Sequence, residues 1–212
     1  MTAFTTKLRQ NPLIPVLAVP NLECAADLAL ALKNGGLKYI EVTLRTDCAL
    51  EAMKEMKQAA PDLCIGMGTV LSDGDVDASL KAGAEFLVTP GTSPRLRDAL
   101  IAQDCCVMVG VATATEVMSR LEEGFGILKF FPAEQYGGAA TLKSFSGPLK
   151  HAQFCPTGGV TYEKIPQYLE LPNVVAVGGS WIATPELILA KDWQQIEANA
   201  KLAAGFAQTP NN

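Results

Sequence analysis

Short apolar runs recur along this chain at a nearly constant spacing, with helix-like stretches between them. The runs begin near Ile14, Tyr39, Cys64, Phe86, Cys106, Ile127, Gln153 and Val174. A repeat of roughly 20 to 26 residues suits a unit of one strand, a loop, one helix and a second loop. Eight such units predict an α/β fold, a single-domain (β/α)8 barrel that takes in residues 1–212. At 212 residues this barrel is near the minimum size.

Helix-start and helix-stop residues fall between the apolar runs. The candidate N-caps are Asn21, Ser72, Ser93, Thr113 and Thr184. Glu116 completes a capping box with Thr113, and glycines follow several of the expected helices. The first dozen residues predict a helix that closes the bottom of the barrel, and the residues after Trp193 predict a final amphipathic helix. The polar residues 208–212 are expected to fray.

The main competing architecture is an open, doubly wound sheet. That fold needs fewer strands and usually carries a Gly-x-Gly-x-x-Gly turn after its first strand. Pro20, Asn21 and Leu22 stand where those glycines would be. The barrel is therefore the better interpretation.

Composition narrows the class of function. The chain is 49% hydrophobic and 18% charged, which is ample apolar material for one large core. Its N-terminus does not resemble a signal peptide, and no apolar run approaches the roughly 20 residues of a membrane span. The net charge of -5 is spread along the chain without a basic stripe. We therefore expect a cytoplasmic protein with a small-molecule partner, and neither a nucleic-acid nor a membrane partner.

Cysteine and histidine usage restricts the available chemistry. The six cysteines form no Cys-x-x-Cys pair, and we interpret them as reduced and structural, including the neighbours Cys105 and Cys106. The single histidine, His151, is expected to be an exposed loop residue. One histidine cannot build a zinc site from several imidazoles. Catalysis is therefore expected to use Lys, Glu, Asp, Arg, Tyr or Thr.

The second apolar run places ionisable groups inside the barrel. Side chains alternate between the two faces of a strand, so Tyr39, Glu41, Thr43 and Arg45 are predicted to face the barrel interior. An ionisable group in such a packed interior costs several kcal/mol unless it is paired or functional. A structural ion pair between Glu41 and Arg45 is one alternative. A functional site is the other.

Lys129 lies in the sixth run, between Ile127-Leu128 and Phe130-Phe131. Apolar neighbours remove water that stabilises the ammonium form, and a neutral amine is a nucleophile toward a ketone carbonyl. Considered alone, Lys129 would more often be a strand-end lysine whose amine reaches solvent. On strand six, however, it enters the same interior as Glu41 and Arg45. An amine, a carboxylate and a guanidinium together predict imine chemistry on a 2-keto acid.

Several loops after strands carry residues suited to binding an anion. Thr69 follows the glycines of the third run, where the backbone can approach a ligand, although a turn residue leading into a helix is the alternative. Gly158-Gly159 and Gly178-Gly179-Ser180 follow the seventh and eighth runs. The loops after the last two strands are the recurrent phosphate site of such barrels. Tight turns would explain one glycine pair, but two pairs at these places predict a phosphate site.

With these residues in view, the chain resembles the 2-keto-3-deoxy-6-phosphogluconate (KDPG) aldolase family, which also handles 4-hydroxy-2-oxoglutarate (KHG). The similarity covers nearly the whole length. The segments that carry it are Glu41–Thr46, Gly66–Val70, Thr89–Gly91, Lys129–Glu134, Cys155–Gly159 and Gly178–Trp181. The resemblance implies a class I aldolase, which forms an imine and needs no metal or other cofactor. Its products are pyruvate and D-glyceraldehyde 3-phosphate, or pyruvate and glyoxylate.

The resemblance also implies a role for each residue of the site. Lys129 forms the Schiff base, and Glu41 is the general acid and base. Arg45 and Thr69 hold the pyruvyl carboxylate, and Pro90 shapes that end of the pocket. Thr157 lies near the aldehyde-derived half of the substrate. The phosphate is bound by Gly158, Gly159, Gly178, Gly179 and Ser180. The family is typically trimeric, so a homotrimer is expected.

Two positions depart from the family pattern, and three alternatives remain. Relatives often have prolines where this chain has Val109 and Ala114, positions that shape a loop and supply no reacting group. The first alternative is an aldolase for the galactonate analogue, against which Arg45 in Thr-Leu-Arg-Thr argues modestly. The second is a barrel isomerase of amino-acid biosynthesis, which has no need for Lys129. The third is a sensor that only binds phosphorylated sugar acids.

Overall fold

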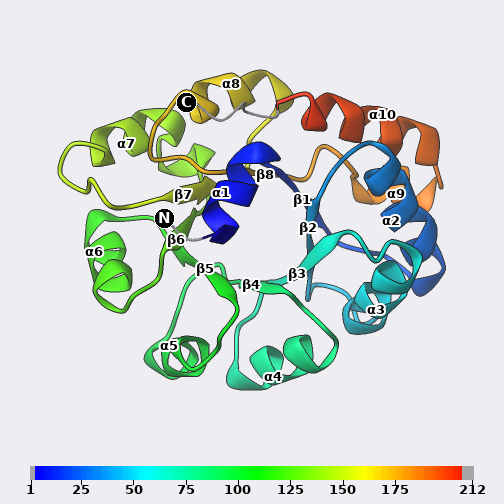
Figure 1. The fold of residues 1–212 in the computed structure, drawn as a ribbon, viewed down its shortest axis with the longest axis horizontal. Helices are drawn as coiled ribbons and strands as arrows, with labels where there is room; N and C mark the ends of the chain where they lie inside the picture. The colour runs from blue at the N-terminus through cyan, green and yellow to red at the C-terminus, as the bar shows by residue number, and fades with distance from the viewer. Residues whose placement is uncertain (1–2, 207–212) are drawn as a thin grey trace.

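The computed structural model describes residues 3–206 of the chain, and the residues expected to fray lie outside this range. A ring of parallel strands surrounds a central space, and helices surround the ring (Figure 1). The strands are β1 (Leu13–Leu17), β2 (Tyr39–Thr43), β3 (Cys64–Gly68), β4 (Phe86–Val88), β5 (Cys106–Val111), β6 (Ile127–Phe130), β7 (Phe154–Pro156) and β8 (Val177–Gly179). The predicted (β/α)8 barrel is confirmed.

Helices alternate with the strands along the chain, except that α1 precedes β1 and both α9 and α10 follow β8. The α-helices are α1 (Ala3–Gln10), α2 (Ala25–Asn34), α3 (Ala49–Ala59), α4 (Asp73–Lys81), α5 (Pro94–Ile101), α6 (Ala114–Glu122), α7 (Gly138–Phe145), α8 (Ile165–Leu169), α9 (Pro185–Leu189) and α10 (Trp193–Ala204). Three 3-10 turns are also present in the described chain: η1 (Leu22–Cys24), η2 (Glu134–Tyr136) and η3 (Tyr162–Lys164). In the described residues, no helix combines the length and apolarity that crossing a membrane requires.

The helix starts confirm the predicted caps. The side chains of Asn21, Ser72, Ser93, Thr113 and Thr184 each accept a backbone N–H in the first turn that follows. Capping of this kind satisfies amides that the helix leaves without partners. The capping box of Thr113 and Glu116 is complete, because the Glu116 carboxylate also accepts the Thr113 amide.

The strands follow chain order around the ring, and β8 lies beside β1. Between β7 and β8 the barrel is joined by two isolated bridges, Phe154 to Val174 and Thr157 to Gly178. β8 therefore begins at Val177, later than the run near Val174 predicted. Val174 pairs with β7 before the chain reaches its register with β1.

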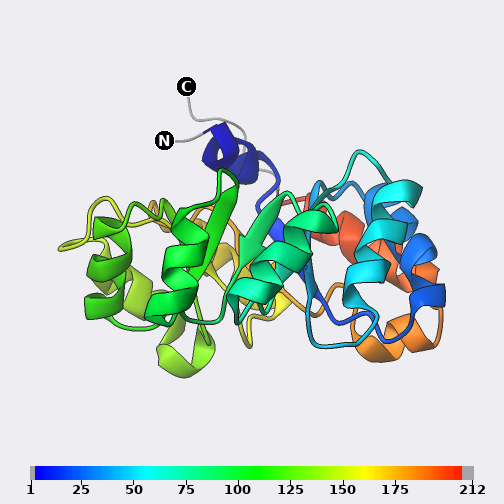
Figure 2. The ribbon, with the colours of Figure 1, turned by 90° about the horizontal axis from the view of Figure 1, so that it is seen from below.

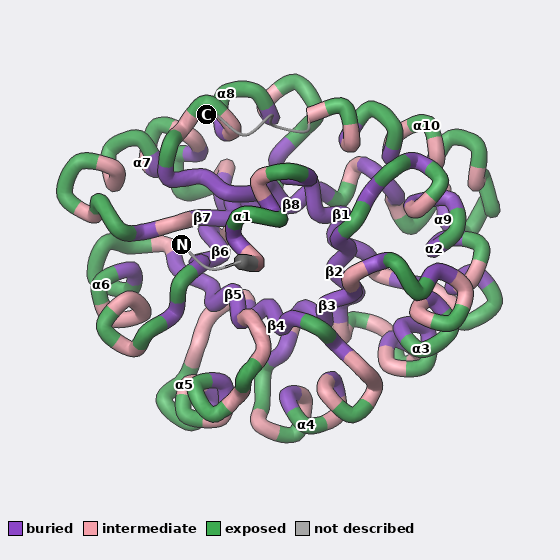
Figure 3. The backbone as a smooth tube through the Cα atoms, in the orientation of Figure 1, coloured by how far each residue is buried: buried purple, intermediate pink, exposed green. Residues whose placement is uncertain are grey.

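The buried apolar residues form two layers. The predicted alternation of side chains along each strand decides which layer a strand residue joins. The outer layer, between strands and helices, includes Ile40, Val42 and Leu128. The inner layer fills the barrel interior with strand residues of the opposite parity, together with Leu8 of α1 and two residues that precede β8: Leu8, Ile14, Tyr39, Phe86, Val88, Met108, Ile127, Cys155, Val175 and Ala176. Buried backbone forms the inner ring, and exposed residues lie on the outer helices (Figure 3).

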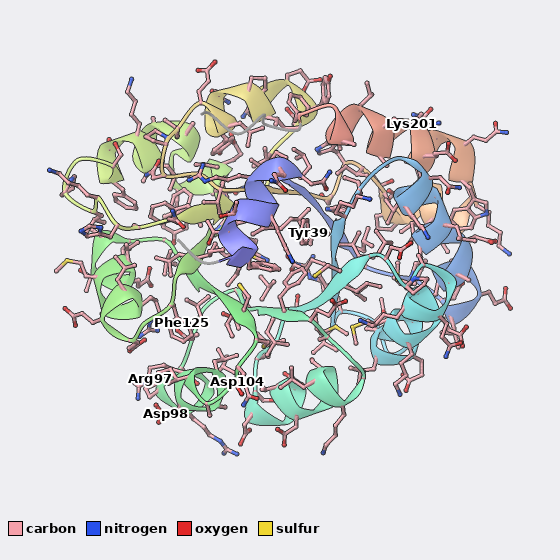
Figure 4. The ribbon with its side chains drawn as sticks, in the orientation of Figure 1. Tyr39, Arg97, Asp98, Asp104, Phe125 and Lys201 are labelled. Atoms are coloured by element: carbon pink, nitrogen blue, oxygen red, sulfur yellow. The ribbon has the colours of Figure 1, made fainter. Side chains whose placement is uncertain are left out.

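Helix α1 covers one end of the barrel, as predicted. Figure 2 shows it outside the ring of strands. Phe4 packs against Tyr39 and Phe86 with ring centroids 5.6 and 5.7 Å apart, and both partners begin their strands. In Figure 4, Tyr39 lies at the barrel centre beside α1, whereas Arg97 and Asp98 lie on the outer helix α5. The N-terminal ends of the strands are thus covered, which leaves the C-terminal ends for a site.

Candidate active site

Lys129 and Glu41 form an ion pair inside the barrel. The Lys129 Nζ lies 3.2 Å from Glu41 Oε1, and each residue is only 3% exposed. The two strands that carry them, β6 and β2, are far apart in the chain, but alternation points both side chains into the interior. A buried pair of this kind gains little stability over apolar residues of the same size. The buried pair therefore indicates a functional role more than a contribution to folding stability.

The backbone around this pair is built to leave room for it. A Cβ added at Gly68 would lie 2.0 Å from Glu41 Oε1, so only glycine at the end of β3 accommodates the carboxylate. On the other side, the Lys129 Nζ lies 5.3 Å from the centre of the Phe131 ring. An aromatic face attracts an ammonium and excludes water from it. The amine is thus held between a carboxylate and a ring.

Arg45 does not pair with Glu41, contrary to the structural alternative. Its Nε donates to the Thr69 hydroxyl at 3.3 Å, and the residue is exposed. Thr69 has a φ of 60°, an uncommon backbone conformation for a residue other than glycine, and one that turns its side chain toward Arg45. Arg45 and Thr69 therefore stand together at the rim above the buried pair.

The glycine-rich loop after β7 closely approaches the glycine-rich end of β8. Gly178 and Gly179 lie within β8 and not, as was predicted, after it, and only Ser180 follows the strand. A Cβ at Gly178 would lie 2.3 Å from Thr157 Oγ1, and Gly158 and Gly159 have φ values of 103° and 75°, which favour glycine. Within the described chain, the amides of Gly158, Gly159 and Ser180 donate no hydrogen bond to another protein group. Amides left free in this way are available to an anion.

A cleft of about 90 Å³ joins most of these elements. Its lining comprises Val16, Arg45, Phe131, Thr157, Gly158, Gly159, Val160, Gly178 and Ser180. A cation, a hydroxyl, one glycine loop and the glycine end of β8 thus face one space at the C-terminal ends of the strands. That combination can hold a ligand with an anionic group at each end.

Five predicted residues do not line this cleft: Glu41, Thr69, Pro90, Lys129 and Gly179. Pro90 packs against β5, where a Cβ at Gly110 would lie 2.1 Å from its carbonyl carbon. Gly179 is buried, and a Cβ there would lie 2.8 Å from Trp181 Nε1. Conversely, the lining residues Val16 and Val160 were not predicted. Val16 shares the face of Ile14 on β1, so alternation was the signal that could have found it.

The described thiols and the histidine supply no competing nucleophile near the amine. Burial raises the pKa of the Cys155 thiol, in the barrel interior, to about 12. Burial likewise raises the pKa of both Cys64 and Cys106 to about 12. His151 is an exposed turn residue, as expected. Within residues 3–206, no cluster of three or more His, Cys, Asp or Glu side chains is arranged to hold a metal ion.

Comparison with known proteins gives the same answer as the geometry. The family model described as KDPG and KHG aldolase matches residues 4–199. The chain belongs to this family. One relative, the 2-dehydro-3-deoxy-phosphogluconate aldolase of Zymomonas mobilis, is 43% identical over 97% of both chains. The predicted family is confirmed.

Two solved structures of KDPG aldolases superpose on the whole barrel. The enzyme of Legionella pneumophila, with pyruvate captured as a covalent carbinolamine, has a TM-score of 0.91 and 39% identity, covering 95% of this chain and 98% of that one. The enzyme of Zymomonas mobilis with 3-phosphoglycerate has a TM-score of 0.89 and 41% identity, covering 98% and 97%. The Legionella pneumophila enzyme thus forms a covalent adduct with pyruvate, and the Zymomonas mobilis enzyme was solved with a phosphorylated acid, on the fold that this chain shares.

A protein described as KDPGal, solved in its native state, is a more distant neighbour. Its structure superposes with a TM-score of 0.80 and is 27% identical to this chain, covering 93% of this chain and 97% of that one. Both values are lower than those of the two KDPG aldolases. The similarity thus favours the gluconate type.

Proposed function

We propose that this protein is a class I aldolase that cleaves KDPG to pyruvate and D-glyceraldehyde 3-phosphate. The observation that carries the proposal is the buried pair of Lys129 and Glu41, 3.2 Å apart. A nucleophile and a base within hydrogen-bond distance are what covalent catalysis of this kind needs. The KDPG aldolases that share this chain's fold and family support the same reaction.

Imine formation begins at the Lys129 amine. Glu41 first takes a proton from the Lys129 ammonium. The neutral Nζ then attacks the C2 ketone and forms a C–N bond as the carbonyl π bond breaks, and the carbonyl oxygen takes that proton from Glu41 to give a carbinolamine. Glu41 accepts a proton from the attacking nitrogen and returns it to the C2 hydroxyl, which leaves as water. The carboxylate lies close enough to act directly or through one water.

Carbon–carbon cleavage follows from the iminium. The C4 hydroxyl loses its proton to Glu41, the C3–C4 bond breaks, and its electron pair moves into an enamine. D-Glyceraldehyde 3-phosphate then departs. The enamine carbon takes a proton, and water hydrolyses the imine to release pyruvate and the free amine. Water is released once and consumed once, so the overall reaction needs no further reactant.

The remaining residues hold the two ends of the substrate. Arg45 and Thr69 would bind the pyruvyl carboxylate, and Pro90 would shape that end. Thr157 would contact the aldehyde-derived half. The amides of Gly158, Gly159 and Ser180, with Gly178 and Gly179 at the end of β8, would bind the phosphate. The shared cleft and the free amides support this assignment.

Cleavage of KHG to pyruvate and glyoxylate is a second proposed activity, because KHG has the same pyruvyl half and the family name includes it. The sensor alternative is weaker, since binding alone gains little from a desolvated carboxylate beside a desolvated amine. A cytoplasmic homotrimer stays a prediction, which light scattering of the purified protein tests for the oligomer.

Borohydride reduction in the presence of pyruvate is the decisive experiment. A pyruvyl adduct on Lys129, located by peptide mass analysis, is expected. No adduct on Lys129 contradicts the mechanism, and an adduct without KDPG cleavage favours the sensor. Parallel kinetics with KDPG and its galactonate epimer then test the substrate, and a large preference for the epimer would refute the gluconate assignment.

A further inference from the structure

Glu134 joins both ends of the loop that carries Gly158 and Gly159, and no step of the mechanism above uses it. It lies in η2, five residues beyond Lys129, in the segment that connects β6 to α7. The loop in question starts after β7 and ends in η3 and α8. The contacts of Glu134 reach both of these boundaries.

The backbone of Glu134 holds the start of the loop. The amide of Ala133 donates to the Thr157 carbonyl at 2.8 Å, and the amide of Glu134 donates to the Gly158 carbonyl at 3.1 Å. These bonds extend the pairing of β6 with β7, in which the Thr157 amide donates to the Phe130 carbonyl at 2.9 Å. The first two loop carbonyls are thus fixed to the segment that follows Lys129.

The carboxylate of Glu134 holds the end of the loop. One oxygen accepts the Tyr168 hydroxyl at 2.5 Å, and the other pairs with the Lys164 ammonium. Tyr168 is fully buried in α8. Because η3 and α8 follow the glycine loop directly, these two contacts fix the residues at which the loop ends.

The middle of the loop also packs against Glu134. A Cβ at Gly159 would lie 3.0 Å from Glu134 Cβ, so the glycine backbone rests directly on this side chain. A pair of glycines with positive φ has many accessible conformations unless its surroundings select one. Contacts at the start, middle and end of the loop select one here.

The charge and burial of Glu134, Tyr168 and Lys164 indicate that this cluster fixes the geometry of the loop more than it adds to folding stability. Burial alone would raise the pKa of Glu134, but the hydrogen bonds from Lys164 and Tyr168 outweigh it and lower the pKa. The carboxylate is therefore charged, and Lys164 neutralises it beside a loop proposed to bind an anion. Buried polar groups add little net stability compared with apolar ones, whereas a fully satisfied network can specify a single geometry.

We propose that Glu134, through Tyr168 and Lys164, is a positioning residue that holds the Gly158-Gly159 loop in the shape that binds the substrate's phosphate. This inference rests on the proposed function, but it concerns the phosphate end and not the imine. Disturbing the cluster should therefore weaken phosphorylated ligands and spare those without a phosphate.

Tyr168→Phe and Glu134→Gln test this with little change of shape. The first measurement is the affinity for 3-phosphoglycerate by calorimetry, which requires no turnover. We expect about tenfold weaker binding in both variants, in line with the loss of a hydrogen bond to a charged group. KM for KDPG should rise by a similar factor. By contrast, kcat/KM for KHG and the rate of borohydride trapping of pyruvate should stay within about twofold of the parent.

Matched controls are available in neighbouring segments. Tyr136→Phe alters an exposed tyrosine, and Glu163→Gln alters an exposed glutamate in η3. Neither should change the affinity for 3-phosphoglycerate. Gly159→Ala, which places a side chain on a residue with a φ of 75°, should weaken binding and thereby locate the anion at this loop.

The other possible results distinguish failure of this inference from failure of the proposed function. Unchanged affinity in both variants would overturn it. An equal loss for KHG and for pyruvate trapping would show a general structural role instead. A parent that traps pyruvate but does not bind 3-phosphoglycerate would refute the phosphate loop and leave the imine function standing. A parent that traps no pyruvate would refute the proposed function, while the affinity comparison would still test Glu134.

Discussion

At the scale of single residues, the proposed chemistry depends on two charged side chains that the barrel interior shields from water. Glu41 and Lys129 are both buried, and each is the other's ionic partner. In such an environment, removing one partner leaves an uncompensated buried charge, at a cost of about 3 to 5 kcal/mol. Variants at this pair therefore need a measurement of folding beside every measurement of activity.

Lys129→Ala is expected to abolish both imine trapping and turnover, because it removes the amine that forms the imine in the proposed mechanism. Glu41→Gln should slow turnover by about a hundredfold to ten-thousandfold, the usual contribution of a general acid and base, yet still permit some adduct formation. Steady-state kinetics and borohydride trapping measure the two effects. Lys150→Ala, at an exposed lysine, is the control. Normal turnover in either site variant contradicts the assigned roles.

Gly68→Ala is expected to disable the site without removing a reacting group. The new methyl would lie 2.0 Å from Glu41 Oε1, so the carboxylate must move away from Lys129. Activity should fall at least tenfold, and unfolding should become easier by about 1 to 3 kcal/mol, as for other overpacked interiors. Gly126→Ala is the matched control, because a Cβ there has nothing within 4 Å. Equal effects at both glycines would argue against a steric role for Gly68.

At the scale of elements, helix caps define where each β/α unit turns. The boundaries of α6 illustrate this, because Thr113 and Glu116 exchange side-chain and backbone hydrogen bonds at its start. Burial alone would raise the pKa of Glu116, but hydrogen bonds from the amides of Ala112 and Thr113 outweigh it and lower the pKa. The charged carboxylate thus stabilises the folded state.

Glu116→Gln is expected to reduce the free energy of unfolding by about 1 kcal/mol at pH 7. Because the folded-state pKa of Glu116 is lowered, its contribution is complete above the ordinary carboxyl pKa of about 4.3 and is lost as the pH falls below it. The difference between variant and parent should therefore shrink in acid. Denaturant unfolding across this pH range measures it, with Glu122→Gln on the exposed face as the control. A difference that grows in acid would contradict the assignment.

For the whole molecule, the two ends of the barrel have separate tasks. Helix α1 closes the N-terminal ends with Phe4 and the fully buried Leu8, while the candidate site occupies the C-terminal ends. A second, larger hollow of about 450 Å³ lies at the closed end, lined in part by Phe4, Cys106 and Phe125, and it contains none of the proposed catalytic residues. Stability and catalysis should therefore respond to different substitutions.

Leu8→Ala is expected to destabilise the protein by about 2 to 5 kcal/mol, which corresponds to a melting temperature lower by about 10 °C in a chain of this size. At 25 °C, kcat/KM for KDPG should stay within about twofold of the parent, because the cavity opens at the far end of the barrel. Thermal unfolding and steady-state kinetics test the two halves of this prediction. Loss of activity in the folded variant would show that the ends are coupled.

The repeat of apolar runs was sufficient to predict the barrel, because parallel β/α units of this length close only in a few ways. Alternation within β2 and β6 was sufficient to point Glu41 and Lys129 inward, since a side chain cannot change face without changing register. Capping residues likewise predicted where helices begin. All of these signals are local or periodic, and such signals can be detected in a single sequence.

Contacts between loops were decided only by the tertiary structure. The sequence left Arg45 free to pair with Glu41, but the structure directs it to Thr69. Nothing local in the chain connects Glu134 with Tyr168, or joins Thr157 to Gly178 across the seam between β7 and β8. Such contacts depend on how distant loops pack after the barrel has closed. No periodic pattern in the sequence predicts them. The amino-acid sequence thus determined the barrel and its inward lysine, whereas packing of the loops decided which residues surround the candidate site.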